Sequence, residues 1–453
     1  MNKHFLKNLR DSMPEPLKYI SAPLIRNTLV RNDDFLRYYK LLSDRESLNE
    51  EQIRKYQFDN LKKLLIHSYK NVPYYTGLFD SVSFDPCNFN DFRDMEKIPF
   101  LTRELVAANF DKLVSRKSVG NGYYLGNTGG TSGLPLKFYL DYDSIYKENA
   151  FLYYYRKKAG YEFKHRLATF RQVGMGHRHW RFDPMYNEII FSPVTLSAKT
   201  VQKYVSRINA FNPQFINGYL SVIWFFAKLL KEYDLKLNAK LKGIFLMSEN
   251  VNEKQQKFVE EVFETRTYVH YGHSERCVLA EGIENQRYRF DPYYGYTEQV
   301  HICDDLYSIV GTGFLNYYMP FIRYKTDDVC TPDGQYFQIL GKRSSNVGLI
   351  GKSGQFLTIT SLDLEKEAFK NVITYQFVQK EQGKADMLII VNKAFQPSEM
   401  DAIQKTIEKD CRGIIEFNIT QVDHLILTPR GKSRTFVSYL NPNINFKKSE
   451  EQD

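Results

Sequence analysis

The chain has 453 residues, of which 43% are hydrophobic and 25% are charged. This length and composition are typical of a folded protein with two or more domains, and they exclude an extended disordered chain. The formal net charge of +9 is modest, and the basic residues are dispersed, which excludes the concentrated basic surface of a nucleic-acid-binding protein. Anionic small molecules, or weak contact with an anionic membrane surface, suit this charge better.

The cysteines do not form a recognisable framework. They are five in number and widely spaced, at Cys87, Cys277, Cys303, Cys330 and Cys411. Free thiols in a reducing cytoplasm are the simplest interpretation, and zinc is not expected because structural zinc sites usually show close pairs of ligands. The N-terminus has no signal-peptide pattern, and no apolar run reaches the length of about 18 residues that would span a membrane. We therefore expect a cytoplasmic protein.

The first 70 residues have a helical pattern in which basic residues alternate with leucine, isoleucine and tyrosine. We expect these helices to pack on the main domain, with contact at a membrane surface as the alternative. Further along, Thr102 is placed to cap a helix that begins at Arg103.

The segment Asn127–Pro135 contains three glycines, two threonines and a serine between two short apolar runs that indicate strands. Glycines let the backbone approach a ligand closely, exposed N–H groups can bind an anion, and hydroxyls add neutral donors. The segment therefore predicts either a phosphate-binding loop or a mobile surface loop. It is not a Walker A loop, because it has no Gly-Lys-Ser/Thr sequence.

Strand and helix patterns alternate over residues 143–271. The expected helices cover 143–158, 198–210, 220–233 and 252–263, and the expected strands cover 166–173, 215–217, 243–247 and 267–271. This alternation predicts a parallel sheet with helices on both faces. The sequence pattern over residues 295–340 predicts short strands and turns. A boundary near 341–346 separates them from a smaller β-rich α+β domain, with helices at 362–371 and 397–410.

Four candidate site residues follow these elements, each with two interpretations. Glu275 ends Tyr271-Gly-His-Ser-Glu275 after a strand, where it either holds Mg²⁺ or is a surface residue in a turn. Asp328 either accepts hydrogen bonds from ribose hydroxyls or forms an Asx turn. Lys432 lies between glycine and serine, and either reaches a reacting phosphate or belongs to an exposed basic loop. His177 follows a strand, and either contacts substrate or belongs to a structural cluster.

The order of these segments resembles the motifs of the adenylate-forming (acyl-activating) superfamily. The motifs are the Gly/Ser/Thr loop, Tyr-Gly-His-Ser-Glu at 271–275, Arg-Tyr-Lys-Thr-Asp-Asp at 323–328, Gly-Lys-Arg at 341–343 and Pro-Arg-Gly-Lys-Ser-Arg at 429–434. Further pieces at 71–75, 98–103 and 216–219 resemble the phenylacetate–CoA ligase branch and its relatives in capsular polysaccharide biosynthesis, the CapK-like family. The resemblance spans most of the chain, from about residue 55 to about residue 435.

This resemblance implies a mixed α/β fold, in which a large N-terminal domain of stacked sheets and helices carries a small mobile C-terminal α+β domain. Residues 1–70 would be helices packed on the main domain, 71–343 the large ATP- and acyl-binding domain, and 344–453 the lid. The implied reaction uses ATP and Mg²⁺ to activate a carboxylic acid as an acyl-adenylate, and transfers the acyl group to CoA or to an amine or sugar acceptor. A non-catalytic relative that binds a nucleotide or an envelope precursor is the alternative. The resemblance is compatible with a homodimer as well as with a monomer.

The resemblance also assigns roles to single residues. The β- and γ-phosphates would be bound by Thr128, Gly129, Gly130, Thr131, Ser132 and Gly133. The rest of the nucleotide site would contain Tyr271, Gly272, Ser274, Asp328 and Arg343, with Glu275 on Mg²⁺ and Asp328 on the ribose. Lys432 would be the adenylation lysine, and the substrate would contact His177, Gly218 and Tyr219. The sequence departs from the family pattern at Asp327, where glycine is usual, and at 341–346, where the hinge aspartate is missing.

Overall fold

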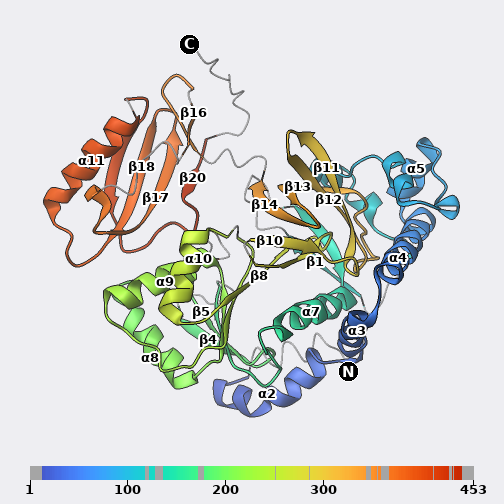
Figure 1. Ribbon diagram of the computed structural model, residues 1–453, viewed down its shortest axis with the longest axis horizontal. Helices are drawn as coiled ribbons and strands as arrows, with labels where there is room; N and C mark the ends of the chain where they lie inside the picture. Colours follow the sequence, from blue (N-terminus) through green and yellow to red (C-terminus); the bar gives the residue numbers. More distant parts are fainter. Residues whose placement is uncertain are drawn as a thin grey trace.

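A computed structural model describes residues 13–117, 122–127, 136–171, 178–249, 251–284, 286–342, 348–354, 356–358, 367–411, 413–427, 431 and 433–440. A twelve-stranded mixed sheet forms the centre of the molecule, and a four-stranded sheet lies in the C-terminal part (Figure 1). The predicted mixed α/β fold is confirmed.

The N-terminal part is helical, as the sequence pattern predicts. Its main helices are α2 Glu15–Leu29, α3 Asp33–Asp44, α4 Glu50–Asn71 and α5 Pro73–Ser81, followed by the short α6 Arg103–Ala108. Thr102 caps α6 through its side chain, as expected. Phe35 of α3 makes edge contacts with Tyr153 and Phe163, which ties the N-terminal helices to the main body.

A hairpin and a long helix follow. β1 Tyr123–Asn127 and β2 Lys137–Asp141 are antiparallel, so the expected strands on both sides of the glycine-rich segment are present. Asp141 then caps α7 Tyr142–Lys157 by accepting a hydrogen bond from the Ser144 backbone. The helix therefore starts directly after the hairpin.

The predicted parallel region forms one end of the large sheet. Its parallel strands, in spatial order, are β5 Glu188–Phe191, β3 Leu167–Phe170, β6 Phe215–Gly218, β7 Gly243–Leu246 and β8 Thr267–Gly272. The antiparallel β4 Trp180–Asp183 closes the edge. α7 covers one face of these strands. The other face is covered by α8 Val201–Phe211, α9 Leu220–Glu232 and α10 Glu253–Phe263.

The second half of the sheet is antiparallel. It consists of β9 Leu279–Gly282, β10 Arg287–Phe290, β11 Gly295–Cys303, β12 Leu306–Gly313, β13 Tyr324–Asp333 and β14 Tyr336–Lys342. The prediction of short strands over 295–340 was wrong, because the last four have 9, 8, 10 and 7 residues. Each pairs with a neighbour along much of its length, so polar residues on one face do not interrupt it.

The C-terminal part contains β15 Gly348–Ile350, β16 Phe356–Thr358, β17 Val372–Glu381, β18 Lys384–Val391, α11 Pro397–Cys411, β19 Glu416–Gln421 and β20 Phe436–Ser438. The helix expected over 362–371 falls largely outside the described residues, and its described end is a 3-10 turn, Glu367–Phe369. Ile373 and Ile390 pack into the same apolar core as α9, and Lys228 Nζ donates to the Ile373 carbonyl at 2.7 Å. These contacts join the four-stranded sheet to the large body.

All five cysteines are free thiols. Across the described helices, none combines the length and apolar character needed to cross a membrane.

Candidate active site

The central strand β8 is only partly covered. It pairs with β7 on one side and with β9 on the other, and such interior strands are normally buried. All of β7 and most of β9 are buried, whereas no residue of β8 is. Because alternate side chains of a strand point to opposite faces, the sheet is accessible on both sides of β8. β8 ends at Gly272, at the carboxyl edge where open α/β sheets bind ligands.

Three side chains converge at the carboxyl end of β8. The Tyr271 hydroxyl donates to Asp328 Oδ2 at 2.8 Å and lies 2.5 Å from His273 Nε2. His273 Nε2 lies 3.6 Å from the same carboxylate oxygen. Burial and then the Asp328 charge raise the pKa of the Tyr271 phenol well above its ordinary value, so it remains a proton donor. The structure thus brings together two residues of the expected nucleotide site that are 57 positions apart.

A bulge in β13 aims Asp328 at Tyr271. The pairing of β12 with β13 shifts register between Ser308 and Val310, and Asp327 has a φ of 65°. This left-handed conformation is one that glycine adopts freely and that aspartate tolerates. Asp327 therefore takes a backbone conformation that suits glycine, the residue usual at this position, and the bulge turns the next side chain toward the site.

Glu275 stands beside Tyr324, in the turn that follows β8. The Tyr324 hydroxyl donates to Glu275 Oε1 at 3.3 Å. Burial, followed by the nearby Glu275, Cys277 and Asp327, raises the pKa of Tyr324 far above its ordinary value. Glu275 supplies one carboxylate, which fits Mg²⁺ when phosphate oxygens complete the coordination, and no three metal-ligating side chains are grouped within the described part of the chain.

Arg276 ties this turn to the hairpin that carries the glycine-rich segment. Its guanidinium is buried, and it donates to the Tyr124 hydroxyl of β1 at 3.1 Å and to Ser144 of α7. It also pairs with Glu148 of α7 at 2.9 Å. The strands that lead into and out of the glycine-rich segment are therefore anchored next to Glu275. The segment's own residues 128–133 lie outside the described residues, as do His177, Arg343 and Lys432.

Two glycines of β12 support the same turn, and the sequence analysis missed them. A Cβ added at Gly313 would lie 2.1 Å from the Arg276 carbonyl oxygen, and one at Gly311 would lie 2.9 Å from the Cys277 carbonyl oxygen. β12 therefore passes directly against the backbone that positions Glu275. The Gly-Thr-Gly sequence at 311–313 was the available signal.

The expected substrate residues at the end of β6 have different environments. Gly218 is the last residue of β6, and a Cβ there would lie 3.0 Å from the Phe170 carbonyl oxygen. The structure places Tyr219 in the apolar core with residues of α9. Gly272, the last residue of β8, and Ser274, in the turn that follows, are both exposed.

Two of the other family-like pieces have structural tasks. Tyr75 accepts from the Ile322 backbone and donates to the Pro320 carbonyl, both at 3.0 Å. Arg323 is buried, pairs with Glu298 at 2.7 Å and donates to the Ile98 carbonyl at 2.5 Å. These contacts fix the strand that leads to Asp328.

The chain is similar to known proteins over much of its length. No protein-family model matches the chain. The chain is 21% identical over 363 residues to protein CapK of Staphylococcus aureus, covering 75% of this chain and 79% of that protein. A stretch of 55 residues, 12% of each protein, is 38% identical to phenylacetate-coenzyme A ligase of Thermus thermophilus.

Solved structures extend the likeness to the fold. A 2-hydroxyisobutyryl-CoA ligase, crystallised in the postadenylation state in complex with R3-HIB-AMP, superposes with a TM-score of 0.61. The superposition covers 84% of this chain and 88% of that chain, at 14% sequence identity. The same ligase in complex with 2-HIB-AMP and CoA superposes with a TM-score of 0.52 at 13% identity, over 86% of this chain and 91% of that chain. These values show a shared fold.

Proposed function

The chain has the fold of the adenylate-forming superfamily and is related in sequence to its CapK-like branch, and from this premise we propose that it is an ATP-dependent ligase that activates a carboxylic acid as an acyl-adenylate. The observation that carries the proposal is the contact between Tyr271 and Asp328 at the open end of β8, next to Glu275. This is a place where a sheet of this kind binds a nucleotide.

In this reaction, an oxygen of the substrate carboxylate forms a bond to the α-phosphorus of ATP. The bond from that phosphorus to the bridging oxygen breaks, and pyrophosphate leaves. Asp328 has a second carboxylate oxygen with which to accept hydrogen bonds from the ribose, while Tyr271 holds the first. Bound Mg²⁺ would supply positive charge to the phosphates at Glu275, and Lys432 would supply it between the two negative reactants.

We assign the helices of residues 1–70, the ATP- and acyl-binding residues 71–343 and the lid 344–453 to three successive regions. All strands of the four-stranded sheet lie beyond residue 371, which supports this division. The phosphate loop 128–133, Arg343 and Lys432 are carried over from the family pattern, with His177, Gly218 and Tyr219 at the acid.

The acyl-adenylate would pass its acyl group to CoA or to an amine or sugar acceptor. Crystallised relatives of the same fold hold an acyl-AMP or CoA, which supports the first acceptor. The relationship to CapK supports the second, in capsule or cell-envelope polysaccharide biosynthesis. Supplying purified acyl-adenylate to the protein with either CoA or an amino sugar, and following loss of the adenylate, separates the two acceptors.

Pyrophosphate release from Mg·ATP, measured across a panel of aryl, alkyl, hydroxy and dicarboxylic acids, tests the proposal. Hydroxylamine traps the acyl-adenylate as a hydroxamate. We expect Lys432→Ala to abolish turnover, and Asp328→Asn to lower kcat/KM for ATP by roughly 10- to 100-fold, because a charged acceptor of hydrogen bonds is lost. Asp305→Asn removes an exposed carboxylate elsewhere in the same half of the sheet and should change nothing.

Two outcomes would contradict the proposal in different ways. ATP binding without turnover of any acid would identify the non-catalytic relative that binds a nucleotide or precursor. Absence of ATP binding in both the wild type and Asp328→Asn would show that the end of β8 is not a nucleotide site.

A further inference from the structure

A polar cluster lies on the face of the sheet opposite to Tyr271. Register places Asn217 of β6 beside Phe245 of β7, and Phe245 beside Tyr268 of β8. His270 lies two residues further along β8 and therefore points to the same face as Tyr268, whereas Tyr271 points to the other. This face is covered by α7, and no residue of β8 on it is fully buried.

Arg156, in the last turn of α7, lies over this face without a carboxylate. Its Nη2 donates to Asn217 Oδ1 at 3.0 Å, and its guanidinium lies 4.7 Å from the centre of the Phe245 ring. Its buried Nε has no hydrogen-bond partner. Within the described part of the chain, Arg156 makes no ion pair.

Three other arginines beside the sheet are neutralised by carboxylates. Arg171, at the end of the neighbouring β3, pairs with Glu188 at 2.5 Å, and Thr169 bonds the second oxygen of that carboxylate. Arg276 and Arg323 pair with Glu148 and Glu298. Arg156 therefore differs from these three arginines, because it is a part-buried cation that no carboxylate among the described residues offsets, and such a charge is costly to keep.

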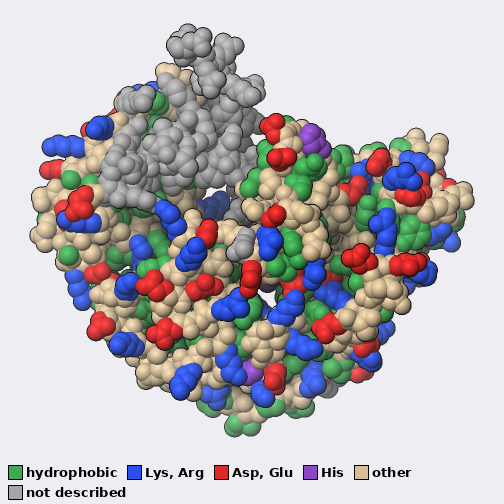
Figure 2. All heavy atoms as spheres, in the orientation of Figure 1, with side chains coloured by type: hydrophobic (Ala, Val, Ile, Leu, Met, Phe, Trp, Pro, Cys, Tyr) green, Lys and Arg blue, Asp and Glu red, His purple; other side chains and the backbone are tan. Residues whose placement is uncertain are grey.

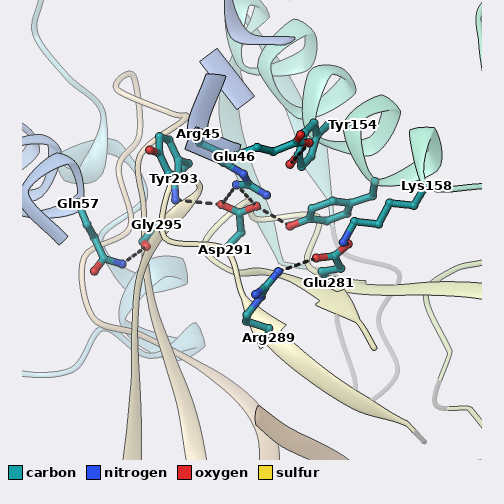
Figure 3. Close-up of polar contacts among 11 residues, drawn as sticks. Arg45, Glu46, Gln57, Tyr154, Lys158, Glu281, Arg289, Asp291, Tyr293 and Gly295 are labelled. Atoms are coloured by element: carbon teal, nitrogen blue, oxygen red, sulfur yellow. Dashed lines mark hydrogen bonds and ion pairs between the residues drawn. The ribbon is translucent and has the colours of Figure 1, made fainter. Parts of the chain in front are cut away.

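The nearest carboxylate on β9 is already engaged. Glu281 is the direct cross-strand neighbour of His270, but it pairs with Lys158 at 2.5 Å and with Arg289 at 3.3 Å (Figure 3). Burial and then the charge of Arg156 lower the pKa of His270 to about 4, so the imidazole is neutral at pH 7. It can therefore accept or donate a hydrogen bond without adding charge. The cluster keeps an excess of positive charge at Arg156.

This cluster adjoins the carboxyl edge at which the acid would react. Asn217 immediately precedes Gly218, the last residue of β6, and His270 immediately precedes Tyr271 on β8. One residue of a strand spans about 3.3 Å, so Asn217 and His270 lie close enough to that edge for one small molecule to reach from the edge to both side chains. A substrate whose reacting carboxylate sits at the edge would extend its other end over β6 and β8 toward Arg156.

We infer that Arg156, with Asn217 and His270, forms a subsite for a second anionic group of the substrate, so that the preferred acid is a dicarboxylate or a similarly doubly anionic acid. The inference rests on the proposed function, because it names the substrate class of that site. A guanidinium without a carboxylate partner suits a second carboxylate of the substrate, whereas an unsubstituted aryl or alkyl chain would leave its charge unpaired.

The test compares acids that differ only in the second carboxylate: succinate with butyrate, glutarate with valerate, and phthalate with benzoate. We expect the wild type to prefer the diacid of at least one pair by 10-fold or more in kcat/KM for pyrophosphate release. Arg156→Met keeps the length of the side chain and removes its charge. We expect it to lose that preference, because it lowers kcat/KM for the diacid and leaves the monoacid unchanged or faster.

Arg156→Lys restores the charge without the planar fork, and it should recover part of the preference. Arg266→Met, which removes an exposed arginine paired with Glu284, is the matched control and should keep the preference. Equal turnover of diacids and monoacids by the wild type would overturn the inference, as would an equal loss for both acids in Arg156→Met. If Arg156→Met does not fold, the wild-type comparison and Arg156→Lys still decide the matter.

Failure of the proposed function gives a different result. If no acid releases pyrophosphate, the thermal unfolding of the wild type with and without each diacid still reports on the subsite. Stabilisation by a diacid that is absent with its monoacid and lost in Arg156→Met would support the subsite alone. Absence of any difference between diacid and monoacid would reject it.

Discussion

Asp327 and Asp328 are adjacent in the sequence, but they contribute to the site in different ways. Asp328 provides the carboxylate that meets Tyr271, and Asp327 provides a backbone angle, with φ at 65°. Residues with a β-branched side chain pay a steric penalty in this left-handed region, whereas glycine does not. The position of the Asp328 carboxylate therefore depends on which residue precedes it.

A matched pair of substitutions separates the backbone from the charge. We expect Asp327→Gly to change the free energy of unfolding by less than about 1 kcal/mol, and Asp327→Val to lower it by roughly 1–3 kcal/mol, because valine is strained at positive φ. Asp327→Val should also weaken ATP binding by displacing Asp328. Urea denaturation and ATP titration measure the two effects.

Thr331→Val, in the same strand but without a positive φ, is the control and should be nearly neutral. Equal stability of Asp327→Gly and Asp327→Val would show that the bulge does not require this conformation.

The sequence could locate Tyr271, Glu275 and Asp328, because each follows a recognisable apolar strand in a motif of known order. It could not show that Tyr271 donates to Asp328, since that contact depends on the bulge in β13. Arg156 belongs to no recognisable sequence motif, and it is one of many basic residues on helices. Its isolation becomes visible only when the partners of neighbouring arginines are known.

The buried carboxylate of Asp291 joins three parts of the chain. Asp291, after β10, pairs with Nη1 of Arg45, which begins the 3-10 turn after α3, at 2.7 Å (Figure 3). It also accepts from the Tyr155 hydroxyl of α7 at 2.7 Å and from the Tyr293 backbone at 2.9 Å. The side chains of Arg45 and Asp291 are 13% and 2% exposed, so this pair is shielded from water.

We expect Arg45→Met to lower the free energy of unfolding by about 3–5 kcal/mol, because it leaves the charge of Asp291 buried and unpaired. Adding Asp291→Asn in the same chain should recover part of the loss. Lys40→Met breaks an exposed pair with Asp44 in the preceding helix and should cost less than about 0.5 kcal/mol. Urea denaturation compares the variants, and similar losses for Arg45→Met and Lys40→Met would contradict the argument.

Elements with local signals were predicted more accurately than elements defined by distant partners. The helix expected at 252–263 is α10 Glu253–Phe263, with Asn252 as its cap, because the cap and the apolar period are both local. The antiparallel strands were underestimated in length. Their pairing depends on long-range contacts, such as the approach of Gly313 to the Arg276 backbone, which no local pattern encodes.

Helix α2 presents an apolar stripe to solvent. Leu17, Ile20 and Leu24 follow a helical spacing and are 52%, 78% and 72% exposed. Apolar side chains gather along the lower rim of the molecule in Figure 2, where α2 runs in Figure 1. The preceding sequence, Met1–Ser12, contains three residues that are lysine or arginine, one phenylalanine and two leucines. Apolar side chains next to basic residues suit the surface of an anionic membrane.

We propose that α2 contacts such a surface peripherally, and sedimentation with lipid vesicles tests this. Binding should be stronger to vesicles that contain anionic lipid than to neutral vesicles, and should weaken as salt is raised, because basic residues contribute. Replacing Ile20 and Leu24 by aspartate should reduce the bound fraction at least tenfold, since each buried aliphatic side chain contributes roughly 1.5–3 kcal/mol. Leu340→Asp, on β14 and 52% exposed, should bind like the wild type. If the wild type stays in the supernatant at low salt, or Leu340→Asp is equally defective, α2 is not a membrane contact and its stripe is an ordinary exposed surface.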